Sequence, residues 1–147
     1  MKYQYNDGGR SQYFKGDAGD CVVRAIAIAS GLNYKKVYDD LYKLNAEYAI
    51  SKDTKVARRL RNKSATPRNG NYKKVYHDYI LSLGFKWTPT MLVGQGCKVH
   101  LKADELPSGT FIARVSKHLC AVIDGEIHDT FNPSREGTRC VYGYYQK

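Results

Sequence analysis

The sequence predicts an α+β fold in which N-terminal helices, among them a buried helix that starts at Cys21, pack on a C-terminal antiparallel β-sheet. Apolar residues recur at helical spacing over residues 21–30, 34–49 and 71–83. From Phe85 onward they occur in short β-branched or aromatic runs between turn residues, which is typical of strands. Helices that precede strands in this way indicate an α+β domain. We expect residues 1–147 to form a single domain, since this length suffices for one hydrophobic core.

The first predicted helix is apolar on nearly all sides. It covers residues 21–30, and after the cysteine only Arg24 interrupts the run of Val, Ala and Ile. A helix of this composition is typical of a protein interior. Gly31 is placed to end it, because glycine readily adopts the left-handed conformation found at helix C-termini.

Two amphipathic helices are expected next. Asn33 is placed to cap a helix over residues 34–49, and Asn71 to cap another that ends at Gly84. The C-terminal half then contains the segments predicted as strands, which are residues 85–91, 109–115, 118–123, 126–131 and 140–145.

A hairpin is predicted at Asp124-Gly125, the strongest turn signal in the chain. A two-residue turn there sets the pairing of the flanking strands and puts His118 and Asp129 on one face of the sheet, about 7–8 Å apart. A carboxylate at that distance can reach the imidazole and fix its tautomer. Asn132 falls on the opposite face and becomes the partner of His118 only if the strand bends.

Cys21 is placed at a helix N-terminus, where a cysteine can act as a nucleophile. The helix dipole and the unpaired N–H groups stabilise a thiolate there and lower the pKa of the thiol. The backbone N–H of Cys21 can also donate to a developing oxyanion. The alternative is that Cys21 is the first packed residue of a buried helix.

Together these residues form the pattern that cysteine-dependent acyl transfer requires. Cys21 supplies a nucleophile, His118 a general base and Asp129 an acid that orients the histidine. The sequence therefore favours a thiol-dependent hydrolase that cleaves a peptide or isopeptide bond.

Two segments, GDCVVRAIAIA and GTFIARVSKHLCAVIDGEIHDTFNPSREG, resemble a minimal papain-like cysteine peptidase. The first is similar to the nucleophile segment of ovarian-tumour-type deubiquitinases, and the second to the ending of bacteriocin-processing peptidases. The chain also resembles small phage-encoded proteins with the same ending. The resemblance implies a papain-like fold and a catalytic triad, here Cys21, His118 and Asp129, with Asn132 as the alternative third member.

The resemblance leaves the second donor of an oxyanion hole unassigned. Papain-like enzymes commonly carry a glutamine about six residues before the cysteine, where this chain has Lys15. The deubiquitinase segment carries an aspartate closer to the cysteine, at the position of Ala18 here. The nearest candidates for this role are Gln12, Asp17 and Asp20.

A basic segment over residues 52–74 favours a second class of function. It contains nine Lys and Arg residues against one acid, and the whole chain has a net charge of +10 at pH 7. Such a cluster can neutralise phosphates or attract an acidic protein. We expect the segment to be exposed, with Arg58, Arg59 and Arg61 involved in recognition. The alternative function is therefore a catalytically inactive, basic papain-like module that binds nucleic acid or an acidic protein.

The other cysteines give no sign of a cofactor. Cys97, Cys120 and Cys140 are widely spaced, and we expect all four cysteines of the chain to be free thiols. The spacing Cys97-x-x-His100 followed by His118-x-Cys120 matches no standard zinc module, so neither a metal nor another cofactor is predicted.

Nothing in the sequence indicates a membrane protein. Residues 1–15 contain no apolar core of a signal peptide, and no run approaches the roughly 18 apolar residues of a transmembrane helix. We expect a soluble, cytoplasmic protein whose partners are a protein or peptide substrate and, through the basic segment, nucleic acid.

Overall fold

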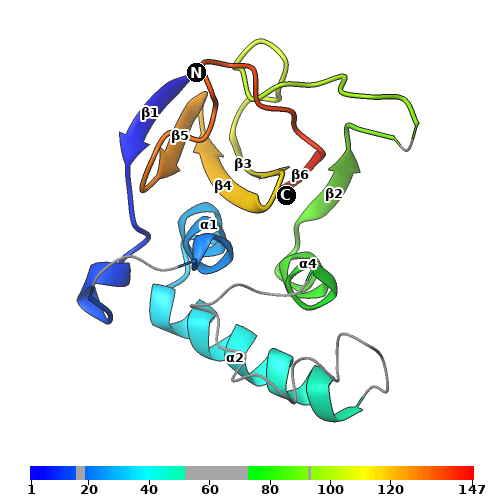
Figure 1. The fold of residues 1–147 in the computed structure, drawn as a ribbon. Helices are drawn as coiled ribbons and strands as arrows, with labels where there is room; N and C mark the ends of the chain where they lie inside the picture. Colours follow the sequence, from blue (N-terminus) through cyan, green and yellow to red (C-terminus); the bar gives the residue numbers. More distant parts are fainter. Residues whose placement is uncertain (16–18, 52–72, 93) are drawn as a thin grey trace.

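In a computed structural model of the chain, the α-helices of the described residues lie on one side of a curved six-stranded sheet (Figure 1). The predicted α+β fold is confirmed, including a first helix that begins at Cys21 and packs on the sheet. The structure describes residues 1–15, 19–51, 73–92 and 94–147. Several residues singled out in the sequence lie outside these ranges, namely Asp17, Asn71, Arg58, Arg59 and Arg61.

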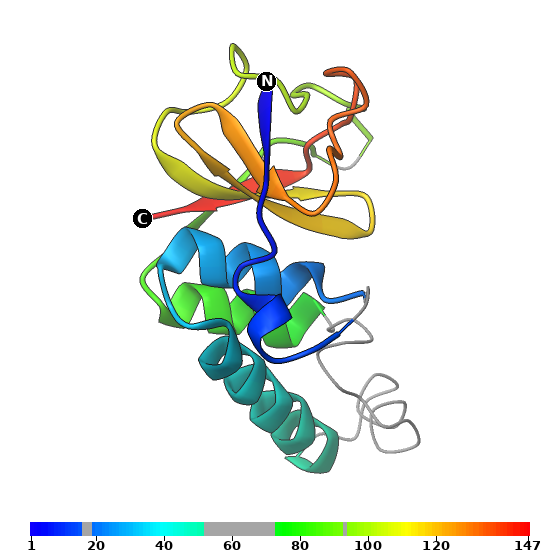
Figure 2. The ribbon, with the colours of Figure 1, turned by 90° about the vertical axis from the view of Figure 1, so that its left-hand side faces the viewer.

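The helices form the layer below the sheet. α1 lies between the sheet and α2, and α4 packs beside them on α2 (Figure 2). None of the helices in the described ranges is long and apolar enough to cross a membrane. A short 3-10 helix, η1 (Arg10–Gln12), precedes α1 (Cys21–Ser30), α2 (Tyr34–Ser51) and α4 (Lys73–Ser82).

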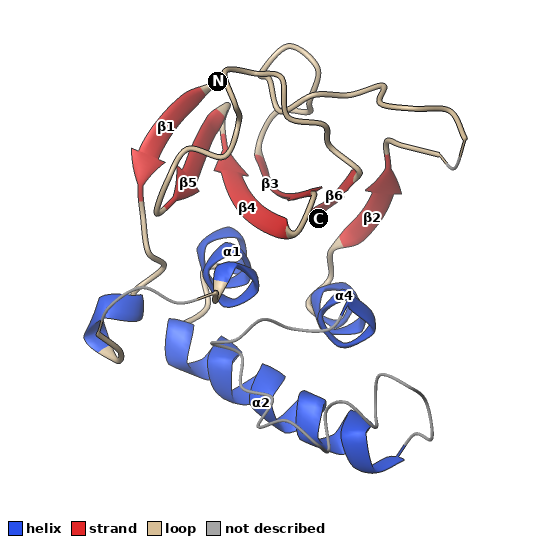
Figure 3. Cartoon of the chain, in the orientation of Figure 1, coloured by secondary structure: helices blue, strands red, loops and turns tan. Residues whose placement is uncertain are grey.

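The sheet has the strand order β1-β5-β4-β3-β6-β2. Every neighbouring pair is antiparallel except β1 and β5, which are parallel. The strands follow one another in an arc above α1 and α4 (Figure 3). They are β1 (Lys2–Tyr5), β2 (Lys86–Pro89), β3 (Thr110–Val115), β4 (His118–Ile123), β5 (Glu126–Asp129) and β6 (Gly143–Gln146).

The boundary between α1 and α2 agrees with the sequence. Gly31 has a left-handed backbone with φ of 75°, and its N–H donates to the carbonyl of Ala27, which ends α1. The side-chain oxygen of Asn33 accepts the N–H of Lys35 at 2.9 Å and so caps the start of α2.

The predicted hairpin joins β4 to β5. Asp124 and Gly125 both have positive φ, at 49° and 79°, as a type I′ turn requires. The turn pairs Val122 with Ile127, so the pairing expected from the sequence is confirmed. This register fixes which residues of the two strands share a face.

Two apolar clusters cover the two faces of the sheet. In β3, Ile112 belongs to the cluster next to the helices, whereas its neighbours Phe111 and Ala113 belong to the cluster on the other face. Val23 and Ile26 of α1 are completely buried in the first cluster. Burial of each such side chain contributes about 1.5–3 kcal/mol, which explains why α1 is apolar nearly all round.

The sequence did not predict β1, and it placed the last strand too early. β1 is a short, mostly exposed edge strand whose partner β5 lies far away in the sequence, so no local pattern signals it. β6 begins at Gly143, while Cys140 forms only an isolated bridge with His100. Gly143 accommodates the ring of Trp87, since a Cβ there would lie 2.2 Å from a ring carbon.

The prediction that all four cysteines are free is wrong for Cys97 and Cys140, which form a disulfide. Their separation of 43 residues gives no local signal, because the two segments that carry them meet only in the folded chain, where the N–H of Val141 donates to the carbonyl of Val99 and the N–H of Leu101 to that of Arg139. Cys21 and Cys120 are free thiols. No group of three metal-ligating side chains occurs within the described ranges.

We predict that the disulfide stabilises the fold. Cys97→Ser should lower the free energy of unfolding by about 2–4 kcal/mol, because the bond closes a long loop and constrains the unfolded chain. Urea unfolding of the variant and of the parent chain measures this difference. Titration of the denatured chain with a thiol reagent should find two thiols before reduction and four after it; four thiols in the unreduced chain would contradict the pairing.

Candidate active site

Three separate elements bring Cys21, His118 and Asp129 together. Cys21 is the first residue of α1, which packs directly on β4. His118 begins β4 and Asp129 ends β5. Because β4 and β5 are antiparallel, these two residues lie at the same end of the hairpin, and His118 Nε2 lies 2.6 Å from Asp129 Oδ2.

The thiol of Cys21 and the imidazole of His118 stabilise each other in their charged forms. Burial raises the pKa of the Cys21 thiol, but the hydrogen bond to His118, the charge of that ring and the N–H of Leu119 outweigh it, so the pKa lies below its ordinary value. Burial lowers the pKa of His118, but hydrogen bonds to Asp129 and Cys21 raise it to about 9. The pair therefore favours the thiolate of Cys21 and the imidazolium of His118. Because ring Nε2 contacts the Asp129 carboxylate, Nδ1 is the ring nitrogen left to interact with the sulfur.

Cys21 remains reachable, although its partners are buried. His118 is 8% exposed and Asp129 is 3% exposed. Cys21 is half-buried and lines a cavity of about 440 Å³ together with the histidine. A molecule that enters this cavity meets the sulfur beside the ring that carries its proton.

Asp129 is held from several sides. One carboxylate oxygen binds His118, and the other accepts the N–H of Thr130 at 2.7 Å and lies 3.3 Å from Arg24 Nη2. Arg24 also pairs with Asp20, the residue that precedes α1. The same turn of helix thus carries the nucleophile and the cation that positions the acid.

Asp20 is the centre of a buried group of charges. Its carboxylate pairs with Arg24, lies 2.9 Å from Arg10 Nε and accepts the hydroxyl of Tyr34. Asp20 has no exposed surface, and both arginines are less than one-tenth exposed. A carboxylate so enclosed accepts hydrogen bonds from its neighbours, and Asp20 does not line the cavity that contains Cys21.

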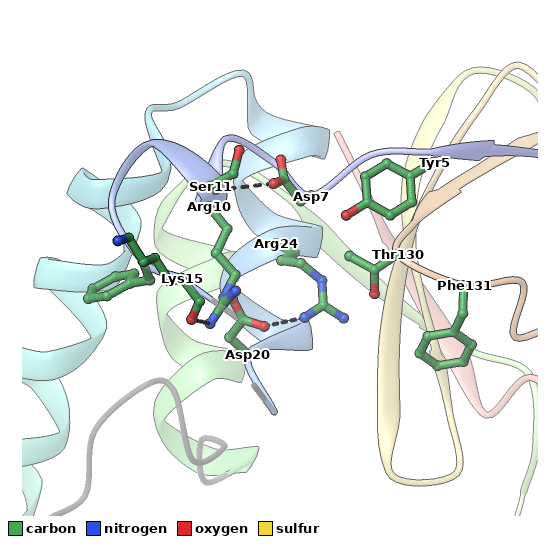
Figure 4. A pocket seen from close by; sticks show the side chains of 10 residues that line it. Tyr5, Asp7, Arg10, Ser11, Lys15, Asp20, Arg24, Thr130 and Phe131 are labelled. Atoms are coloured by element: carbon green, nitrogen blue, oxygen red, sulfur yellow. Dashed lines mark hydrogen bonds and ion pairs between the residues drawn. The ribbon is translucent and has the colours of Figure 1, made fainter. Parts of the chain in front are cut away.

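A second, larger cavity of about 660 Å³ lies beside the first and shares Arg24 and Phe131 with it (Figure 4). Figure 4 shows Arg10, Asp20 and Arg24 together on the α1 side, and Phe131 across from them. The ring of Phe131 lies 5.0 Å from that of His118 and is tilted against it. Cys21 lines only the smaller cavity, which is therefore the candidate substrate site.

The remaining candidates from the sequence do not approach the thiol. Gln12 ends η1 with an exposed side chain and lines neither of these cavities. Asn132 is exposed, and its side-chain oxygen accepts the N–H of Ser134 at 3.0 Å in a local turn. Asp129 and not Asn132 therefore meets His118, as the hairpin register requires.

Sequence reasoning missed three residues of the site. Arg24 had a usable signal, because a charged residue in an otherwise apolar helix needs a buried partner. Tyr76 of α4 and Arg114 of β3 line the smaller cavity, but only the packing of distant elements brings them there.

We predict that Asp129 controls the reactivity of the thiol and that Asn132 does not. Asp129→Ala removes the carboxylate that stabilises the imidazolium, so alkylation of Cys21 by iodoacetamide at pH 6 should slow by at least about tenfold. Asn132→Ala should leave the rate unchanged. Mass spectrometry of the labelled peptide measures both rates, and melting curves verify that the variants are folded. A rate that is unchanged in Asp129→Ala but lowered in Asn132→Ala would show that the Asp129 carboxylate does not control the thiol.

Comparisons with protein families, with curated proteins and with solved structures find no match for this chain. What it does must therefore be inferred from the chemistry of Cys21, His118 and Asp129.

Proposed function

We propose that the chain is a thiol-dependent hydrolase that cleaves a peptide or isopeptide bond. The observation that supports this most directly is the series of contacts from Cys21 through His118 to Asp129 beside an open cavity. A buried thiol with a purely structural role would not need an imidazole paired with a carboxylate. The resemblance of the two quoted segments to papain-like peptidases supports the same function.

The reaction follows from the positions of the protons. The Cys21 thiolate attacks the carbonyl carbon and forms a C–S bond, and the electron pair of the carbonyl moves to its oxygen. When the oxyanion collapses, the C–N bond breaks and the His118 imidazolium gives its proton to the leaving amine. Water then attacks the thioester, His118 takes a proton from it, and the carboxylic acid leaves as the thiolate is restored. Asp129 holds the ring in place throughout.

Two groups are available to stabilise the oxyanion. The backbone N–H of Cys21 is the first of α1 and points along the positive end of the helix dipole. Tyr76 lines the same cavity, and its hydroxyl has no hydrogen-bond partner among the described residues. Burial raises the pKa of Tyr76 and outweighs the opposing charge of Arg114, so the hydroxyl stays protonated and can donate. We assign Tyr76 as the second donor.

The pH dependence of alkylation tests the ion pair. Because the pKa of Cys21 is lowered, the thiolate persists as pH falls below the ordinary thiol range, and iodoacetamide should modify Cys21 at pH 6 several-fold faster than an ordinary thiol. Cys120 is fully buried and burial raises its pKa, so it serves as an internal control. His118→Ala should abolish the advantage. Equal rates for Cys21 in the native and the denatured chain at pH 6 would contradict the ion pair.

Formation of an acyl-enzyme tests the hydrolase. A library of peptide esters and amides, incubated with the chain and quenched in acid, should leave an acyl group on Cys21 that intact-mass analysis detects. Cys21→Ser should not accumulate this thioester. Turnover should fall below the pKa of Cys21 and again above about pH 9, where the His118 imidazolium loses its proton. A thiol that alkylates rapidly but never acquires an acyl group would overturn the proposed reaction.

Tyr76→Phe tests the second oxyanion donor. The variant loses one hydroxyl and keeps the ring that packs in the core, so stability should change little. The acylation rate should fall by about 10²-fold, with little change in KM, since the hydroxyl acts on the charge that develops in the transition state. Alkylation by iodoacetamide, which forms no oxyanion, should be unaffected. An acylation rate within twofold of the parent chain would remove Tyr76 from the mechanism.

A further inference from the structure

Among the described residues, the cavity beside Cys21 is lined by several cations and by no carboxylate. Lys73 of α4, Arg114 of β3 and Lys117 of the β3–β4 turn contribute to its wall. Lys73 and Arg114 also line an adjoining cavity of about 370 Å³, whose other described lining residues are Lys74, His77 and Trp87. The two cavities together form a basic groove that leads to the thiol.

The three cations have no acidic partner among the described residues. Lys74 of the adjoining cavity differs, because it pairs with Asp78 one turn later, as Lys35 and Lys36 of α2 pair with Asp39 and Asp40. Arg24 also lines the groove, but its charge is already balanced by two buried carboxylates. The uncompensated charges of Lys73, Arg114 and Lys117 thus lie where a substrate would lie.

Arg114 is the most strongly positioned of these cations. It is half-buried, and its guanidinium lies 5.6 Å from the ring centre of Trp87 and 6.0 Å from that of Tyr142. Aromatic contacts of this kind hold a guanidinium in place while leaving its N–H groups free to donate. A fixed guanidinium loses less entropy on binding a carboxylate than a mobile lysine does.

We propose that the basic groove selects acidic polypeptide segments and that Arg114 is the residue chiefly responsible for this specificity. The proposal rests on the proposed function, since it places the acidic residues of the substrate next to the bond that Cys21 attacks. A guanidinium binds a carboxylate through paired, charge-assisted hydrogen bonds. A polypeptide fits this groove better than a nucleic acid, because a thiolate needs an acyl carbon and a phosphodiester offers none.

Trp87 provides a direct measurement of binding. It is the only tryptophan of the chain and lies against Arg114, so a ligand on the guanidinium should change its fluorescence. We would titrate the chain with an eight-residue glutamate peptide, a Gly-Ser peptide of equal length and an eight-nucleotide oligothymidylate. The glutamate peptide should bind the most tightly, and its affinity should fall as salt is raised. Binding no tighter than that of the Gly-Ser peptide would overturn the proposal, and tighter binding of the oligothymidylate would reassign the groove to nucleic acid.

Charge variants locate the effect. Arg114→Gln should weaken binding of the glutamate peptide by about tenfold or more, and Arg114→Lys should recover only part of the affinity. Lys98→Gln is the matched control, because this exposed lysine lines neither cavity of the groove and should leave affinity within twofold. Equal affinity for the Arg114→Gln and parent chains, with melting curves unchanged, would remove Arg114 from recognition.

Repeating the titration with Cys21→Ser, which should not accumulate a thioester, measures binding alone and so separates this proposal from the proposed function. Selective binding of the glutamate peptide without any acylation of the parent chain would overturn the hydrolase and leave the selectivity of the groove intact. Acylation at equal rates by peptides with Glu, Gln or Lys beside the reactive carbonyl would overturn the selectivity of the groove and leave the hydrolase intact.

Discussion

Arg24 is buried between two carboxylates, and the arrangement of the candidate site depends on this ion pairing. The arginine joins Asp20, at the start of α1, to Asp129, at the end of β5. When Cys21 is a thiolate and His118 an imidazolium, the charges of this group balance as three cations and three anions. Removing one member of such a group leaves an opposite charge buried without compensation, at a cost of about 3–5 kcal/mol. The charged residues are Arg10, Arg24 and His118 on one side and Asp20, Asp129 and Cys21 on the other.

The fold divides the site between two rigid elements. The first turn of α1 carries Cys21 and Arg24, and the β4–β5 hairpin carries His118 and Asp129. Each element is anchored by its own apolar contacts, so the polar groups need not hold the elements in place. The ion pairs therefore adjust orientation within a frame that hydrophobic packing has already set. This division explains how reactive groups can be buried and charged in so small a protein.

Local signals made much of this predictable. The Asp124-Gly125 turn fixed the register and hence the meeting of His118 with Asp129, and the apolar run after Cys21 identified α1. Contacts between distant segments gave no such signal, as the disulfide and the parallel pairing of β1 illustrate. The partners of Asp20 were missed for the same reason, because Arg10 and Tyr34 reach it from separate elements. Composition reveals that a buried charge needs a partner, but only tertiary packing decides which one.

The parallel pairing of β1 with β5 has a practical consequence. The carbonyl of Asp129 accepts both the hydroxyl of Tyr3, at 3.1 Å, and the N–H of Asn6, at 2.9 Å. The first residues of the chain thus brace the main chain of the residue that orients the histidine. A substitution in this edge strand can therefore disturb the orientation of His118, although neither Tyr3 nor Asn6 lines the cavity beside Cys21.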